Sequence, residues 1–123
     1  MEMTTAVTRL SALAHGGRLS AFRLLIQAGA GGLAAGEIAR SLSILPNTLS
    51  THLAILEQAG LARSHREGRS IIYSANFDAI QGLLAFLLDD CCGGAPEICG
   101  PLNDRLRQAT ACGEAGVPDL EAV

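Results

Sequence analysis

Several features that would point to other classes of protein are missing from this 123-residue sequence. No apolar run approaches the roughly 18–20 residues that a membrane-spanning helix needs. The first ten residues have neither the basic region nor the apolar stretch of a secretory signal peptide. We therefore expect a soluble, cytoplasmic protein.

Motifs of catalysis are also missing. The sequence contains no Cys-x-x-Cys pair and no glycine-rich phosphate-binding loop. Asp89 and Asp90 directly precede the first cysteines, and such acidic neighbours disfavour the thiolate that a catalytic cysteine requires. The three histidines, at positions 15, 52 and 65, are distant in sequence from those cysteines. We therefore predict that the protein is not an enzyme.

Lysine is absent, so all nine basic residues are arginines. Arginine is the better partner for phosphates and guanine edges. The net charge of −3 conceals an uneven distribution: residues 1–75 carry seven arginines and four acids, whereas residues 76–123 carry two arginines and eight acids. An acidic total argues weakly against nucleic acid, so the positions of the arginines decide the question.

Hydrophobic periodicity predicts a single, mainly α-helical domain followed by a short tail. Hydrophobic residues make up 49% of the chain and charged residues 17%, a balance that supports a folded core. The expected helices cover about residues 4–14, 18–28, 35–42, 46–60 and 77–91. In the fourth, Pro46 opens the helix, Leu49, Leu53 and Leu56 form the buried stripe, and Gly60 ends it.

A β-hairpin is predicted between the last two helices, with strands at about 61–66 and 69–75 and a tight turn at Glu67-Gly68. The third and fourth helices form a helix-turn-helix, and the following hairpin and helix complete a winged helix-turn-helix of α+β class. We expect this domain to cover residues 1–92, with an inducer-binding segment and tail at 93–123.

The first and last expected helices each have an apolar face, and the last helix carries more leucine than a small core needs. Val7, Leu10 and Leu13 share one face of the first helix. The last helix is richer still in apolar residues, namely Phe77, Ile80, Leu83, Leu84, Leu87 and Leu88. We therefore predict a homodimer that pairs through these two helices, with packing inside one subunit as the alternative.

Three segments resemble the ArsR family of metalloregulatory repressors. They are the recognition-helix region at 45–61, the wing sequence Arg66-Glu67-Gly68-Arg69 followed by Ile72-Tyr73, and the segment at 13–19, in which His15-Gly16-Gly17 replaces the family's Asp-Pro-Thr. The resemblance covers residues 7 to 92. It implies a repressor that controls arsenic-resistance genes.

Two groups of residues are candidates for DNA binding. With the leucine stripe buried, the exposed face of the fourth helix should carry short polar side chains, namely Asn47, Thr48, Ser50, Thr51 and His52. Arg63, Arg66 and Arg69, together with His65, are expected around the hairpin turn, and Arg18 and Arg40 are weaker candidates. A two-fold dimer would bind a pseudo-palindromic operator in double-stranded DNA.

The cysteines form the least ordinary feature of the sequence. Cys91, Cys92 and Cys99 lie within nine residues. They resemble the arsenite site of an ArsR branch whose cysteine cluster follows the terminal helix; the Cys-x-Cys pair of other arsenic sensors is missing from residues 32–39. Thiolates are soft ligands, and trivalent arsenic or antimony favours three sulfurs in a shallow pyramid. We therefore predict As(III) or Sb(III) as the inducer and no organic cofactor.

Two alternatives stay open for the same cysteines. Zinc or a similar ion would want a fourth ligand, which Cys112 could provide. A thiol-redox response is the other alternative, since Cys92 and Cys99 could close a disulfide loop.

Overall fold

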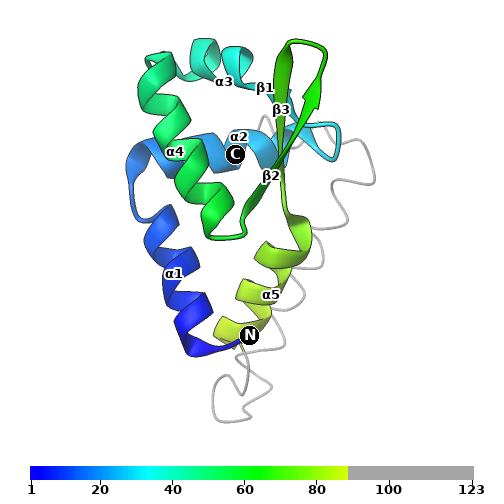
Figure 1. Ribbon diagram of the computed structural model, residues 1–123. Coiled ribbons are helices and arrows are strands. Elements are labelled where there is room, and N and C mark those ends of the chain that lie inside the picture. Colours follow the sequence, from blue (N-terminus) through cyan, green and yellow to red (C-terminus); the bar gives the residue numbers. More distant parts are fainter. Residues whose placement is uncertain (89–123) are drawn as a thin grey trace, which may run out of the picture. The chain divides into compact units, whose positions relative to one another are not determined.

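The computed structural model describes residues 1–88, and all structural statements below concern these residues. It contains five helices and three strands, and the helices and the hairpin follow one another in the order that the sequence predicts for a winged helix-turn-helix (Figure 1). The helices are α1 (Met3–Leu13), α2 (Gly16–Ala28), α3 (Ala35–Leu42), α4 (Pro46–Gln58) and α5 (Phe77–Leu88). The strands are β1 (Leu33–Ala34), β2 (Ala62–Glu67) and β3 (Ser70–Ala75). The winged helix-turn-helix fold is confirmed.

The sheet is antiparallel, with strand order β1-β3-β2. The pairing of Glu67 with Ser70 leaves Gly68 and Arg69 as the two turn residues, so the predicted turn at Glu67-Gly68 is wrong by one residue. Gly68 has a φ of +60°, which the first position of such a turn requires and which glycine adopts without strain. The short strand β1, which pairs with the middle of β3, was not predicted because two residues give no measurable periodicity.

The core lies where the helix-turn-helix packs on α2 and on the base of the hairpin. Its largest side chains with almost no exposure are Leu25, Ile38, Leu49, Leu53, Leu56, Leu61 and Leu83. The predicted stripe of α4 is therefore confirmed, and burial of each leucine contributes about 1.5–3 kcal/mol. This stripe orients α4, because it forces the opposite face of the helix outward.

Helix α1 buries alanines and leaves larger apolar side chains exposed. Ala6 and Ala12 are its buried residues, whereas Val7 is 55% and Leu10 is 41% exposed. Leu19 of α2 is exposed as well. Alanine permits close approach of α1 to its neighbours, so the larger side chains of α1 are left outside the core of this chain.

Residues Met1–Leu84 form one compact unit, which contains the helix-turn-helix and the hairpin. The predicted extension of the last helix to residue 91 and the cysteines at 91, 92, 99 and 112 lie outside the described residues. Among the helices of residues 1–88, none has the length and apolar character to cross a membrane.

Candidate nucleic-acid interface

Helix α4 presents a row of short polar side chains on the face opposite its buried leucines. Asn47, Thr48, Ser50 and Thr51 are all exposed, as predicted. The hydroxyl of Thr51 donates to the carbonyl of Asn47 at 3.3 Å, which leaves its oxygen as an acceptor on this face. Pro46 occupies the first turn and no side chain caps the helix start, so backbone N–H groups there are available to an anion.

Leu45, directly before this helix, is an apolar residue that the sequence analysis did not single out. It is 74% exposed and occupies the N-cap position with an extended backbone. An apolar residue immediately before a helix-opening proline is the only sequence signal that could have revealed it. Leu45 lies beside Asn47 and Thr48, a position that suits an apolar contact with a base edge in the major groove of DNA.

His52 is not on the exposed face, and its predicted exposure is wrong. Only 8% of the residue is exposed, and its ring lies against that of His15, with 4.7 Å between the ring centroids. A histidine three residues after Leu49 and one before Leu53 lies at the edge of the buried stripe, and α2 covers that edge. Helical periodicity alone did not reveal the covering helix.

The hairpin carries its arginines at two levels. Arg66 and Arg69 lie at or beside the tip, exposed, and His65 forms a 3.5 Å exposed ion pair with Glu67. Arg63 pairs with Ser74 near the base of the hairpin, and its guanidinium donates to Asn76 Oδ1 at 3.2 Å. The expectation that all three arginines surround the turn therefore holds for Arg66 and Arg69 and is wrong for Arg63.

The tip of the hairpin and the amino-terminal end of α4 lie on the same side of the compact unit (Figure 1). A helix end with polar side chains and a basic β-tip on one side form a surface that suits the major groove and the flanking backbone of a duplex. This surface is called the candidate DNA surface below. It comprises Leu45, Asn47, Thr48, Ser50, Thr51, Arg66 and Arg69.

Asn76 connects three elements at the ends of α4 and the hairpin that lie away from this surface. Its Nδ2 donates to the carbonyl of Gly60, just past the end of α4, at 2.9 Å. Its Oδ1 accepts from Arg63 on β2 and from the backbone N–H of Ala79, in the first turn of α5. The side chain of Asn76 therefore links the carboxyl-terminal end of α4 and the base of the hairpin to the start of α5.

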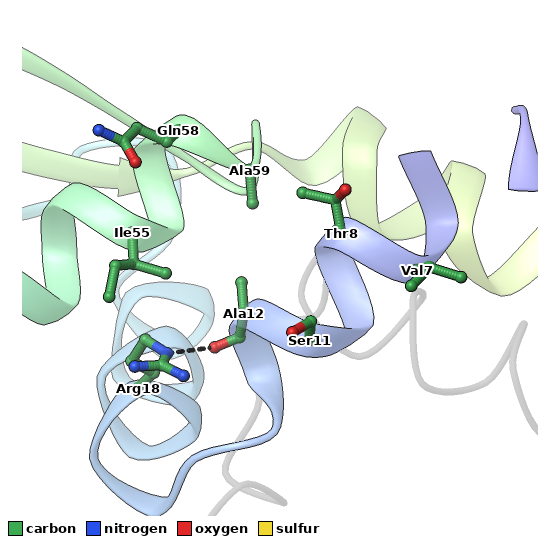
Figure 2. Close-up of a pocket in the computed structure, with 8 residues that line it drawn as sticks. All are labelled: Val7, Thr8, Ser11, Ala12, Arg18, Ile55, Gln58 and Ala59. Carbon is green, nitrogen blue, oxygen red and sulfur yellow. Dashed lines mark hydrogen bonds between the residues drawn. The ribbon is translucent and has the colours of Figure 1, made fainter. Parts of the chain in front are cut away.

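Of the two weaker arginine candidates, Arg18 is engaged elsewhere. Figure 2 shows its guanidinium at an open pocket of about 360 Å³ between α1 and α4, where Nε donates to the carbonyl of Ala12 at 2.6 Å. The pocket is lined by Val7, Thr8, Ser11, Ala12, Arg18, Ile55, Gln58 and Ala59. Its lining holds no carboxylate, cysteine or histidine, so it offers no general acid or base. Arg40 is exposed in the last turn of α3.

Within residues 1–88, no cluster of three or more histidine, cysteine, aspartate or glutamate side chains is placed to hold a metal ion. The predicted ligands Cys91, Cys92 and Cys99 lie outside the described part of the chain. The arsenite prediction therefore rests on the sequence.

Known proteins match both the sequence and the fold. A helix-turn-helix domain family matches residues 13–65. The HTH-type transcriptional regulator YgaV of Escherichia coli K12 is 32% identical over 87 residues, which cover 71% of this chain and 86% of YgaV. The transcriptional repressor SdpR of Bacillus subtilis 168 is 37% identical over 59 residues, covering 48% of this chain and 66% of SdpR.

A solved structure supports the same assignment. A homodimeric winged helix-turn-helix DNA-binding domain from Mycobacterium bovis, described as a possible ArsR-family transcriptional regulator, superposes with a TM-score of 0.59 at 28% identity. The match covers 72% of this chain and 82% of that domain. The fold and the surface define a DNA-binding winged helix-turn-helix protein. The chain belongs to the ArsR-type family of transcriptional regulators, and it is not an enzyme.

Proposed function

We propose that this regulator is a homodimeric repressor that leaves its operator when As(III) or Sb(III) binds Cys91, Cys92 and Cys99, so that arsenic-resistance genes are expressed. The observation that carries the arsenic assignment is the sequence itself, with three thiols in nine residues directly after the last helix. The relative SdpR is named a repressor, which supports the direction of regulation.

The chemistry of the cysteines fits the proposed inducer. Arsenite, As(OH)₃, reacts with three thiols to form three As–S bonds and release three water molecules, with no change in oxidation state. Trivalent arsenic keeps a lone pair and needs only three ligands, so Cys112 is not required. Zinc would want a fourth ligand and leave the three-cysteine site incomplete.

The proposed dimer is supported by the apolar side chains that the compact unit leaves exposed. Met3, Val7 and Leu10 recur along α1 at intervals of four and three residues, which places them on one face, and they are 67%, 55% and 41% exposed. Leu84 on α5 is 38% exposed. The related domain from Mycobacterium bovis is a homodimer. A second copy would remove this apolar surface from water.

The proposed coupling passes through α5. The cysteine segment follows this helix in the chain, and Asn76 at its start contacts the end of α4 and Arg63 at the hairpin base. A ligand that changes the position of α5 would therefore act on the recognition helix and the hairpin together. The ion must favour the DNA-free arrangement, and such coupling is typically about 1–3 kcal/mol.

The test uses the full chain and a duplex that the wild-type protein selects from a random-sequence pool. We expect sodium arsenite to release the wild-type protein, and Cys92→Ser to bind the duplex with unchanged affinity but without release. Cys112→Ser is the matched control and should respond like the wild type. Fluorescence anisotropy of the labelled duplex under anaerobic conditions measures both properties.

Three results would contradict the proposal. If Cys92→Ser no longer binds the duplex while it remains folded, the cysteines have a structural role. If an oxidant releases the wild-type protein and arsenite does not, the regulator responds to thiol oxidation. If zinc or cadmium releases it, arsenite does not, and Cys112→Ser abolishes that response, the site is a four-ligand metal site.

A further inference from the structure

A pair of histidine rings joins the recognition helix to α2. His52 of α4 and His15, the residue that caps α2, have ring centroids 4.7 Å apart and an interplanar angle of 47°. His52 is 8% exposed, and within residues 1–88 its Nδ1 is buried without a hydrogen-bond partner. An unpaired ring nitrogen in the core is costly, so this position calls for a physical account.

The hydrogen bond of His15 requires a neutral ring. Its Nδ1 accepts from the backbone N–H of Gly17 at 3.1 Å, which caps the first turn of α2. A neutral imidazole that accepts at Nδ1 carries its proton on Nε2. Protonation of Nδ1 would set an N–H against the N–H of Gly17 and break the cap. The same tautomer leaves no lone pair on Nε2, which argues against the two rings as ligands of a shared metal ion.

Gly17 shapes the space in which the ring of His52 lies. A Cβ atom at position 17 would lie 2.8 Å from His52 Nε2 and 3.1 Å from its Cδ2, closer than side chains tolerate. The first turn of α2, made of His15-Gly16-Gly17, is therefore a close-fitting contact surface for this ring of α4. Movement of the ring must change how α4 packs on α2.

Electrostatics at this contact also favour the neutral ring. The pKa of His52 is lowered, first by burial and then by the neighbouring His15 and Arg18. The titratable or charged groups that act on this ring are His15, at the N-cap of α2, and Arg18, in its first turn. Arg18 is held in place by its 2.6 Å bond to the Ala12 carbonyl, so its positive charge stays near the ring.

We propose that His15 and His52 are positioning residues that hold α4 in its DNA-binding orientation only while both rings are neutral, so that operator affinity falls when the solution is acidified. The proposal rests on DNA binding by the candidate DNA surface, which α4 carries. Protonation removes the cap acceptor of His15 and adds positive charge beside Arg18. The ring of His52 then leaves its place against Gly17, and α4 shifts relative to α2.

The direction of the effect on stability follows from proton linkage. Because the folded pKa of His52 lies below the unfolded value of 6.5, the unfolded state binds more protons in the window between the two values. The unfolding free energy is therefore highest above pH 6.5 and falls as the pH decreases through that window.

The experiment measures affinity for the selected duplex and thermal unfolding from pH 5.5 to 8. It uses His65→Gln as the background, because His65 on the hairpin is the only other histidine of the chain. On acidification we expect affinity to fall roughly tenfold for each unit by which the pKa of His52 is lower in the DNA-bound arrangement than in the displaced one. The Tm should fall in parallel. Adding His52→Gln should reduce the change in affinity to less than about twofold and flatten the Tm profile. His15→Asn keeps a capping side chain but removes a neighbour that lowers the pKa of His52, so both changes should be smaller than in the background.

Superimposable pH profiles of affinity and Tm in the background and in the His15→Asn variant would overturn the proposal, even if His52→Gln fails to fold. Unfolding requires no DNA, so it separates this proposal from the proposed function. If no duplex binds at any pH, the proposed function fails. The Tm profiles then still decide whether the two rings must be neutral to pack.

Discussion

Gly32 lies against the backbone of β3 near the middle of that strand. Its φ is +71°, a conformation that residues with a Cβ rarely adopt, and an added Cβ would collide with the carbonyl oxygen of Tyr73. That carbonyl belongs to a backbone strand and has no freedom to rotate away. The glycine is therefore required where β1 joins the sheet, and it helps to fix the hairpin beside the helix-turn-helix.

We expect Gly32→Ala to lower the free energy of unfolding by about 1–3 kcal/mol. The matched control is Gly31→Ala, one residue earlier, where an added Cβ meets nothing within 4 Å. The control should leave stability within about 0.5 kcal/mol of the wild type. Urea denaturation of the three proteins measures the difference. Equal stability of both variants would show that β1 tolerates a shift away from Tyr73.

At the scale of elements, the hairpin and α4 present different side chains on the candidate DNA surface. The hairpin tip has long positive side chains suited to phosphates, whereas the start of α4 has short polar side chains and the exposed Leu45, suited to base edges. Arg63 belongs to neither group, because its bond to Asn76 ties it to the hairpin base. On the candidate DNA surface, the positive charge and the short polar side chains therefore lie on separate elements.

Replacing Arg66 and Arg69 together by alanine should weaken binding to all duplexes by a similar factor. The slope of log K against log salt should become shallower by about 0.9 for each phosphate that an arginine no longer neutralises. Gln81→Ala, an exposed neutral change on α5, serves as the control. Anisotropy titrations between low and physiological salt give the slopes. A weakening confined to the selected duplex, with an unchanged slope, would assign these arginines to base recognition instead.

At the scale of the whole molecule, the exposed apolar face of α1 favours a dimer. A chain of this size has a modest core, and a second copy adds buried area that one copy lacks. In the proposed dimer, two recognition helices related by a two-fold axis would bind half-sites about one helical turn apart. Asn76 links the carboxyl-terminal end of α4 to α5. The spacing of the two recognition helices would therefore respond to changes in the position of α5.

Val7→Asp should convert the protein to a monomer, because it places a charge on the apolar face of α1. Leu45→Asp is the control, because Leu45 is even more exposed but belongs to the candidate DNA surface and not to the apolar face of α1. It should stay dimeric while its DNA binding is impaired. Sedimentation velocity at micromolar concentration measures the assembly state. A dimer of Val7→Asp would place the interface on a different face.

Most elements of the fold follow from local signals. The leucines at 49, 53 and 56, with Pro46 before them and Gly60 after, specify α4 and its outward face without any long-range information. The hairpin follows from a β-prone run, Ile71-Ile72-Tyr73, placed after a glycine turn. The two-residue β1 and the one-residue shift of the turn could not be predicted, because both depend on which residues pair across the sheet.

Residues close together along the chain specify the helix-turn-helix, most of the polar face of α4 and the basic hairpin, so these features could be predicted. The surroundings of His52, Arg63 and Val7 could not, because they are set by packing between elements. Each of these depends on a distant partner or on the lack of one: His15 covers the first, Asn76 binds the second, and the alanines of α1 fill the core in place of the third. Periodicity assigns a residue to a face of its helix, but packing between elements determines what covers that face.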